Sequence, residues 1–237
     1  MIRCFHVFDK NTRKFKYLIK IRDGRSIHVK NEDEIILSGE LLSPNEKSPL
    51  RKEDWFCLHI LNGKGKIKKS FFPLYEIAKK NLMCDGIFFC VDEDDNIFGI
   101  QEMEYKIHKF NPRGQLIRVF HTPNHSHYTP PPKEPFKKSF LRSQVIKWMN
   151  SWSHIIGIND YKEYLFVTLS NPDDKPYEFY YDTYTRDGKF IKGSLGANYR
   201  LLYIDKEGMF YFLNEAETNG GEITFSILKY ALRRKAK

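Results

Sequence analysis

The stretch "VDEDDNIFGIQEMEYKIHKFNPRGQLIRVF", Val91–Phe120, decides the fold class. It contains two polar turns between short runs of apolar, β-branched or aromatic residues, and a further apolar run, "GIFFC" at 86–90, precedes it. Such runs fit the pleated, half-buried surface of a sheet, and polar turns between them are typical of hairpins. We therefore expect two hairpins in series, which together make a four-stranded antiparallel unit.

The first turn of this stretch recurs three times in the chain. "VDEDDNIFG" (Val91–Gly99) aligns without gaps on "VKNEDEIIL" (Val29–Leu37), "INDYKEYLF" (Ile158–Phe166) and "IDKEGMFYF" (Ile204–Phe212). Each copy has an apolar residue, a five-residue polar turn and then an apolar or aromatic run. The pattern predicts a hairpin of two buried strands at each place.

The second turn recurs as well. "FNPRGQLI" (Phe110–Ile117) aligns on "LNGKGKIK" (Leu61–Lys68) and "YTRDGKFI" (Tyr184–Ile191). All three copies have a glycine in the same place, at Gly65, Gly114 and Gly188. A tight hairpin needs a positive φ there, which glycine adopts without a clash of Cβ.

The spacing of the copies indicates a repeat architecture. The equivalent residues Val29, Val91, Ile158 and Ile204 lie 62, 67 and 46 residues apart. The shortest interval is close to the ~40–50 residues of a propeller blade, and the longer ones imply insertions. A four-stranded unit cannot bury both faces of its sheet alone, so such units stack around an axis. The sequence predicts an all-β protein, a β-propeller of four-stranded antiparallel blades.

We expect a single propeller domain over residues 1–237. Its blade units are predicted at about 1–21 (partial), 22–75, 84–120, 153–193 and 199–232 (partial). The N-terminal "VFDKNTRKFKYLI" (Val7–Ile19) is a longer copy of the second turn without the glycine. If the two N-terminal strands and the three C-terminal strands formed one blade together, that blade would have five strands, one more than the other blades. The expected ring is therefore incomplete or open, either an arc or part of a longer chain whose beginning is missing.

The repeat resembles that of NHL-type six-bladed β-propellers, and "VDEDDNIF…YKIHKFNPRGQLIRVF" carries the resemblance. Blades of that family read apolar–Asp–turn–Gly–Asn–aliphatic–aromatic, then an aliphatic strand ending near Phe-Asp, then Gly-Lys-Phe. One blade of this chain matches well and the others loosely, with Asp95 and Lys162 where glycine is usual. The resemblance implies an architecture and is nearly silent on activity.

Two segments interrupt the strand pattern. "HTPNHSHYTPPPKEP" (His121–Pro135) is predicted to be a loop, because its prolines suit neither a strand ladder nor a helix interior. An amphipathic helix is predicted over about 136–152, lying on the propeller and burying two tryptophans; the alternative is a helix that faces a partner or a membrane surface. Apolar residues recur in it at three- and four-residue steps, at Phe136, Phe140, Leu141, Val145, Trp148, Met149 and Trp152. A second, short helix is predicted in "PLYEIAKKNLMCDG" (Pro73–Gly86).

The chain is basic, with 39 Lys and Arg against 30 Asp and Glu and a net charge of +9. Local clusters lie at Lys64–Lys69, Lys79–Lys80, Lys137–Lys138 and Arg233–Lys237. This balance makes nucleic acid or an anionic surface a possible partner. No stripe of arginines interleaved with aromatic residues stands out, so ordinary solubilising charge is the favoured interpretation.

The N-terminus and the cysteines bear on the compartment. The N-terminus has no apolar core followed by a small-residue cleavage site, and no apolar run approaches the ~20 residues of a membrane span. We expect a cytoplasmic protein if Met1 is the true start, and a periplasmic or secreted one if the chain is an N-terminally truncated propeller. The four cysteines, predicted to be buried, reduced thiols without metal spacing, are Cys4, Cys57, Cys84 and Cys90.

Histidines form the densest group of possible metal ligands. His121, His125 and His127 lie close in the sequence, and His154 can lie near them in space. Zinc takes neutral histidine ligands, but spacings of four and two in a proline-rich loop match no zinc pattern. A surface loop is favoured.

An acidic turn raises the question of calcium. "DEDDN" (Asp92–Asn96) has acidic or amide side chains at the first, third and fifth positions, as calcium loops do. Ile97 occupies the position that requires glycine, and Met103 that of the bidentate glutamate, so the EF-hand reading fails. The segment is predicted to be a solvated turn.

No catalytic, cofactor-binding or metal residue is predicted, since no Gly-x-Ser-x-Gly, phosphate loop or HExxH motif occurs. Asn159 and Asp205 are polar residues at strand ends and cannot be told from turn formers. The leading hypothesis is a non-catalytic binding or scaffolding module that presents loops to a protein or a small ligand. The alternative is a metal-dependent hydrolase or lyase of the propeller type, and the third is an RNA-binding NHL-type propeller.

Overall fold

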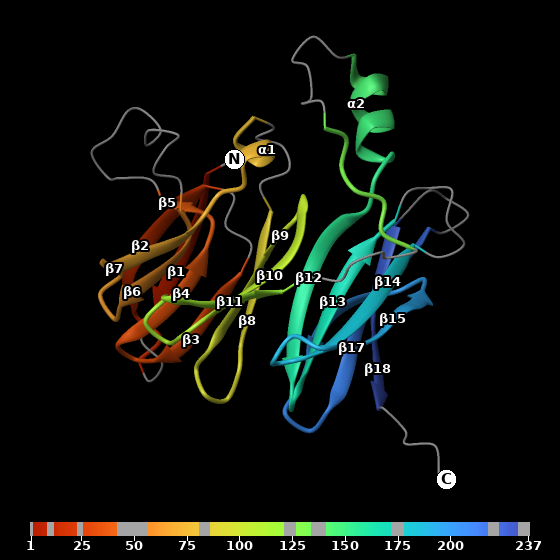
Figure 1. Ribbon diagram of the computed structural model, residues 1–237. Coiled ribbons are helices and arrows are strands. Elements are labelled where there is room, and N and C mark those ends of the chain that lie inside the picture. Colours follow the sequence, from red (N-terminus) through yellow and green to blue (C-terminus); the bar gives the residue numbers. More distant parts are fainter. Residues whose placement is uncertain are drawn as a thin grey trace. The chain divides into compact units, whose positions relative to one another are not determined.

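A computed structural model describes residues 2–8, 12–22, 26–41, 56–80, 86–120, 127–133, 141–171, 178–217 and 223–231 (Figure 1). The strands are β1 (Ile2–Phe8), β2 (Phe15–Arg22), β3 (Ile27–Asn31), β4 (Glu34–Ser38), β5 (Glu40–Leu41), β6 (Phe56–Asn62), β7 (Ile67–Pro73), β8 (Ile87–Val91), β9 (Ile97–Gln101), β10 (Glu104–Phe110), β11 (Leu116–Phe120), β12 (His154–Tyr161), β13 (Tyr164–Ser170), β14 (Phe179–Thr185), β15 (Phe190–Ala197), β16 (Arg200–Ile204), β17 (Met209–Glu217) and β18 (Ile223–Ala231). The helices are α1 (Glu76–Lys80) and α2 (Arg142–Met149). The protein is nearly all-β, as predicted.

The strands of the described residues form five antiparallel sheets. Three are complete four-stranded blades, with the strand orders β3-β4-β6-β7, β8-β9-β10-β11 and β12-β13-β14-β15. A fourth, β16-β17-β18, has three strands, and the N-terminal hairpin β1–β2 pairs with the short β5. The chain therefore has a β-propeller fold with four blades, at the places where the sequence repeats indicated them.

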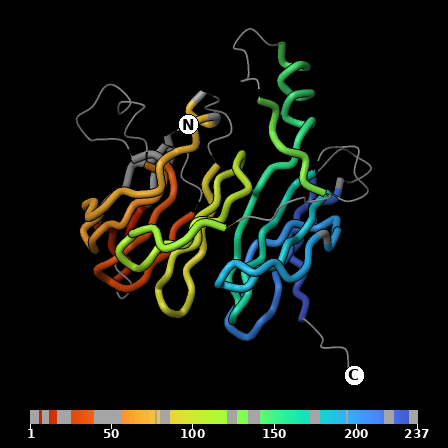
Figure 2. Tube along the Cα trace, viewed as in Figure 1, coloured from red at the N-terminus to blue at the C-terminus, as the bar shows by residue number. Residues whose placement is uncertain are grey.

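The chain divides into two compact units, Met1–Val119 and Phe120–Lys237, which we describe separately. The predictions of a single domain, of six blades and of the state of the ring stay predictions. In the trace of Figure 2, the first unit runs from red to yellow-green and the second from green to blue.

One five-residue turn occurs five times in these blades. The amide N–H of the first residue donates to the carbonyl oxygen of the fifth, with N–O distances of 2.9–3.0 Å. The carbonyl oxygen of the first residue accepts from the amide N–H of the fourth, with distances of 2.8–3.1 Å. The first residues are Asn62, Asp92, Asn111, Thr185 and Asp205, and the fourth, all at positive φ, are Gly65, Asp95, Gly114, Gly188 and Gly208. The predicted conformation of the three equivalent glycines is confirmed, and Asp95 adopts it with a φ of 63°.

The first residue of each turn also caps it with its side chain. Asp92 Oδ1 accepts from the amides of Asp94 and Asn96 at 3.0 and 2.8 Å. Asn111 Oδ1 accepts from the amides two and four residues on at 3.0 and 2.9 Å. A short polar acceptor in this position satisfies amides that the strand ladder leaves unpaired.

Two of the predicted five-residue turns are instead two-residue hairpin turns. In β3–β4 the strands continue until Asn31 pairs with Glu34, and in β12–β13 until Tyr161 pairs with Tyr164. The expectation of a five-residue turn was wrong there. In β3–β4 the reason is Lys30, which occupies the capping position and has no acceptor group.

Within each unit, neighbouring blades pack face to face. The core of the first unit joins the sheet of β3, β4, β6 and β7 to that of β8–β11 through Ile36, Cys57, Leu58, Ile60, Phe71, Phe72, Leu74, Ala78, Ile87, Phe89, Ile97 and Phe110. The core of the second joins the sheet of β12–β15 to that of β16–β18 through Phe179, Tyr181, Leu201, Ile204 and Phe210. Burying these faces is the main stabilisation of such stacked sheets.

An aromatic ring covers the glycine of the second turn in each unit. In the first unit the Phe71 ring lies against Gly114 and edge-on to Phe110, with ring centroids 5.0 Å apart. In the second, Phe120 lies against Gly188 and 6.2 Å from the Tyr184 ring. The equivalence of the two glycines therefore reflects a close approach as well as a positive φ.

The helices follow the prediction in part. The predicted short helix after Pro73 is α1. The longer helix begins at Arg142, and residues 136–140 lie outside the described residues. It has no buried residue and extends away from the strands of its unit (Figure 1). Trp148 is half-buried, and Trp152 is fully buried only after the helix has ended, so the expected burial of two tryptophans on one helix face was wrong.

Candidate ligand pocket

A pocket of about 570 Å³ lies in the first unit, where β7 and α1 meet the blade of β8–β11. Its lining residues are Phe56, Lys69, Ser70, Phe71, Phe72, Pro73, Leu74, Tyr75, Glu76, Lys79, Gln101, Glu104, His108, Phe110, Gly114 and Leu116. A pocket of this volume can hold a small organic molecule. The pocket is therefore the candidate functional site.

Three buried aromatic rings form the floor of the pocket. Phe71 and Phe72 are neighbours in β7, yet both rings contact Phe110, with centroids 5.0 and 5.4 Å from it. Successive side chains of a regular strand point to opposite faces. The φ of 64° at Phe72 departs from the strand conformation and accounts for both rings facing the same blade. A bulky residue at positive φ is strained, and such strain clusters at functional sites.

The Phe72 ring fits because Gly99 leaves room for it. A Cβ at Gly99 would lie 2.9 Å from Phe72 Cε1, closer than carbon atoms approach. The Phe72 ring also lies 4.7 Å from the ring of His108, the residue that pairs with Gly99 across β9 and β10. The strained residue thus packs against two adjacent strands of the next blade.

His108 lines the pocket with a hydrogen-bonding side chain. Its Nδ1 lies 3.2 Å from the carbonyl oxygen of Lys106, which only accepts, so Nδ1 carries the proton and Nε2 is an acceptor. Burial lowers the pKa of His108, and the nearby Glu104 carboxylate opposes that shift in part. The imidazole is therefore neutral at pH 7.

The charged groups of the wall are engaged with protein atoms. Glu104 accepts from Lys106 Nζ at 2.6 Å, an interaction that raises the pKa of Lys106. Lys79 Nζ lies 2.6 Å from Glu76, and Lys69 Nζ donates to the carbonyl of Arg113 at 2.8 Å. The pocket therefore offers aromatic surface and the neutral imidazole of His108, and the charges of its two lysines and two glutamates balance.

Gln101 fixes the shape of the wall. Its Oε1 accepts from the amide of Tyr75 at 2.7 Å, and its Nε2 donates to the carbonyl of Pro73 at 2.9 Å. One buried side chain of β9 thus satisfies the amide of Tyr75 and the carbonyl of Pro73, in the segment that leads from β7 into α1.

Ser70 and His59 are the pair closest to nucleophilic chemistry. They are opposite each other on β7 and β6, and Ser70 Oγ lies 2.9 Å from His59 Nδ1. His59 Nε2 donates to the carbonyl of Gly39 at 2.7 Å. Burial lowers the pKa of His59 to about 4, which makes it a weak base at neutral pH, and its partner is a carbonyl where a catalytic triad has a carboxylate. The pair acts as a hydrogen-bonded part of the core.

The histidines considered as possible metal ligands have structural roles where they are described. His127 stacks on Tyr180 with ring centroids 4.7 Å apart, and His154 donates to the carbonyl of Met149 at 2.7 Å. His121 and His125 lie outside the described residues. Among the residues that the structure describes, no three His, Cys, Asp or Glu side chains gather as a metal site.

The acidic segment Asp92–Asn96 is a turn, as predicted, but one of its residues, Asp92, is buried. Asp92 is 6% exposed, and its side chain accepts hydrogen bonds from amides within the turn. Asp205 Oδ1 caps its own turn by accepting from the amide of Met209 at 2.9 Å, while Asn159 lies within β12. Neither residue lines the pocket.

The cysteines and the basic clusters are partly described. Cys57 is buried and Cys90 half-buried, both as thiols, while the Cys4 side chain and Cys84 lie outside the described residues.

In the basic cluster Lys64–Lys69, Lys68 pairs with Glu34, with Nζ 3.3 Å from Oε2. Residues 137–138 and 233–237 lie outside the described part. No helix in that part is long and apolar enough to span a membrane.

Comparisons with known proteins give likenesses to solved structures only. No protein-family model matches the chain, and no curated protein matches it. A member of the DUF4221 family from Bacteroides vulgatus is 15% identical over 86% of this chain and 63% of its own length, with a TM-score of 0.49. A protein of unknown function from Bacteroides caccae is 11% identical over 95% of this chain and 68% of its own, with a TM-score of 0.48.

A more distant likeness is to a catalytically inactive virginiamycin B lyase from Staphylococcus aureus, solved with quinupristin. It is 10% identical over 99% of this chain and 75% of its own, with a TM-score of 0.43. The chain thus spans about two thirds of the length of the proteins it is similar to. These values give no family and no activity for the chain.

Proposed function

We propose that this protein is a non-catalytic binding module and that the pocket between β7 and β10 is its ligand site. The observation that carries the proposal is the strained Phe72, which with Phe71 and Phe110 forms an aromatic floor beside the acceptor Nε2 of His108. Such a site suits a small ligand with a flat apolar body and one hydrogen-bond donor.

The balance of charge in the wall supports binding over catalysis. General acid–base chemistry works best with a group whose pKa lies near the working pH. His59, with a pKa of about 4, is far from that, and the carboxylate of Glu104 is held by Lys106. The NHL-type resemblance stays a prediction and adds no ligand.

Phenol and its methyl ether, anisole, test the pocket. We expect phenol to perturb amide signals of β7 and β10 in a titration followed by NMR, and to bind about three- to tenfold more tightly than anisole, because only phenol can donate to His108. His108→Phe should remove this preference while leaving anisole binding in place. An equal preference before and after the substitution would contradict the ligand orientation.

A matched pair of variants tests the location. Leu116 at the pocket is 56% exposed, and Leu202 on β16 is 42% exposed. Leu116→Arg should weaken phenol binding at least about tenfold by occluding the aromatic floor, whereas Leu202→Arg should leave it unchanged. If both variants bind phenol equally well, the ligand site lies elsewhere.

The enzyme alternative has one observation in its favour, the Ser70–His59 contact at the pocket. A fluorophosphonate that labels activated serines is expected to leave Ser70 unmodified, as judged by peptide mass spectrometry. Labelling that disappears in Ser70→Ala would establish serine chemistry, and stoichiometric calcium or zinc in purified protein would favour the metal-dependent hydrolase or lyase. RNA binding with a steep salt dependence would favour the third hypothesis.

A further inference from the structure

The acidic residues of the pocket lie at one end of it. Glu104 pairs with Gln101 at the start of β10, and the Gln101 side chain bonds the segment that leads from β7 into α1. Glu76 is the first residue of α1. Each carboxylate lies 2.6 Å from a lysine, Glu104 from Lys106 and Glu76 from Lys79. This end of the pocket is therefore electrically neutral.

The opposite end of the pocket is cationic. Lys69 lies there, near the start of β7, and its Nζ donates to the carbonyl oxygen of Arg113, in the turn that follows β10, at 2.8 Å. This acceptor is neutral, and within the described part of the chain no carboxylate pairs with Lys69. Arg113 adds a second positive charge and is exposed. Because an ammonium group has three donors, Lys69 can bind an anion and keep its bond to Arg113.

The aromatic floor separates the cationic end from the imidazole of His108. Phe72, which contacts the His108 ring, comes three residues after Lys69 in β7. Three residues of a strand span about 10 Å. Phe71 stands between these two residues in the strand, and its ring contacts that of Phe110. A ligand that fills this length has a flat apolar body with a hydrogen-bond donor at one end and an anionic group at the other.

We propose that the ligand of this pocket is a hydroxylated aromatic acid, whose hydroxyl group donates to His108 and whose carboxylate is bound by Lys69. This inference rests on the proposed function and adds the charge of the ligand to it. A hydrogen bond from an ammonium group to a carboxylate is about twice as strong as one between neutral groups. The net charge of +9 on the chain also favours the approach of anions.

The acid para-hydroxyphenylacetate and its methyl ester test the charge of the ligand, because they share the ring and the hydroxyl group and only the acid is charged at pH 7. In the NMR titration used for phenol, we expect the acid to bind about tenfold more tightly than the ester at low salt. This preference should shrink as salt screens the contact with Lys69. If phenol binds but the acid and the ester bind equally, the inference is overturned and the proposed function stands. If none of the three binds, both are overturned.

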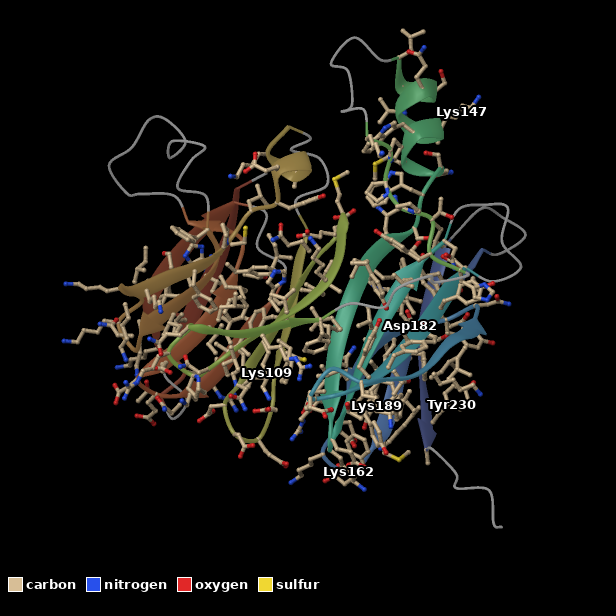
Figure 3. All side chains as sticks on the ribbon, viewed as in Figure 1. Lys109, Lys147, Lys162, Asp182, Lys189 and Tyr230 are labelled. Atoms are coloured by element: carbon tan, nitrogen blue, oxygen red, sulfur yellow. The ribbon has the colours of Figure 1, made fainter. Side chains whose placement is uncertain are left out.

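A matched pair of lysines tests the position of the carboxylate. Lys69→Met removes the charge and should reduce the preference for the acid to about twofold or less, while the ester binds as before. Lys192 has the place of Lys69 in the copy of the repeat in the second unit, three positions after Lys189, which Figure 3 labels. Lys192→Met should keep the full preference. Neither lysine is buried, so both variants should keep the circular dichroism spectrum of the original chain. A preference that survives Lys69→Met, or that both variants lose equally, would overturn the assignment.

Discussion

Replacing Gly114 with alanine is expected to lower the free energy of unfolding by about 2–4 kcal/mol. Gly114 has a φ of 66°, where a residue with Cβ loses about 1–2 kcal/mol. The new Cβ would also lie 2.8 Å from Cδ1 of Phe71, and that ring is fixed between Phe110 and the rest of the core. Urea unfolding at pH 7, followed by tryptophan fluorescence and circular dichroism, measures the loss.

Gly157→Ala is the matched control. The nearest atom to a Cβ at Gly157 is Oγ1 of Thr168 at 3.6 Å, an ordinary contact, and its φ is not positive. This substitution should change stability by less than about 1 kcal/mol, because glycine inside a strand has no advantage over alanine. Similar losses for the two variants would show that Phe71 does not constrain Gly114.

Lowering the pH from 7 to 4 should remove about 2–3 kcal/mol of stability through His59 alone. Burial holds its folded pKa near 4, while the ordinary value is 6.5. The unfolded chain therefore binds a proton at a pH where the folded chain does not. The contribution is complete above pH 6.5 and is lost as the pH falls towards 4. Denaturant titrations at half-unit pH intervals trace this loss.

His59→Gln isolates that contribution. The variant should be less stable than the original chain at pH 7, because it loses the ring contacts to Ser70 and Gly39. Its stability should fall less steeply between pH 6.5 and 4, and the difference between the two curves belongs to His59. His28 and His108 also have pKa values lowered by burial and titrate in the same direction in both proteins, so they cancel in the difference. Parallel curves would contradict the assignment.

The blades were predictable because their signals are local. Strand alternation and the acceptor and glycine of a five-residue turn lie within a few residues of each other, as at Asn111 and Gly114. The two-residue turn of β12–β13 was missed because its residues match those of the five-residue turns: Asn159 aligns with the capping Asp92, and Lys162, like Asp95, has a positive φ. The course of α2 was missed because the apolar spacing continues into Trp152, which is buried after the helix ends.

The pocket was not predictable from the sequence. It depends on the positive φ of Phe72 in β7, and on the space left by Gly99 and the hydrogen bonds of Gln101, both in β9. The sequence Phe-Phe-Pro at 71–73 predicts the reverse, because proline restricts the residue before it to extended backbone, whereas Phe72 has a φ of 64°. In the sequence, His108 is an ordinary polar residue of a strand, and nothing near it indicates the contact of its ring with Phe72.

The ring of Phe71 over Gly114 also sets how the first unit can be divided. A cut between β7 and β8 would separate the two partners and leave the ring and the core around it in water, although each sheet would keep every strand-to-strand hydrogen bond. We therefore expect the smallest autonomous fragment to be a pair of adjacent sheets, and an excised domain should contain both of them.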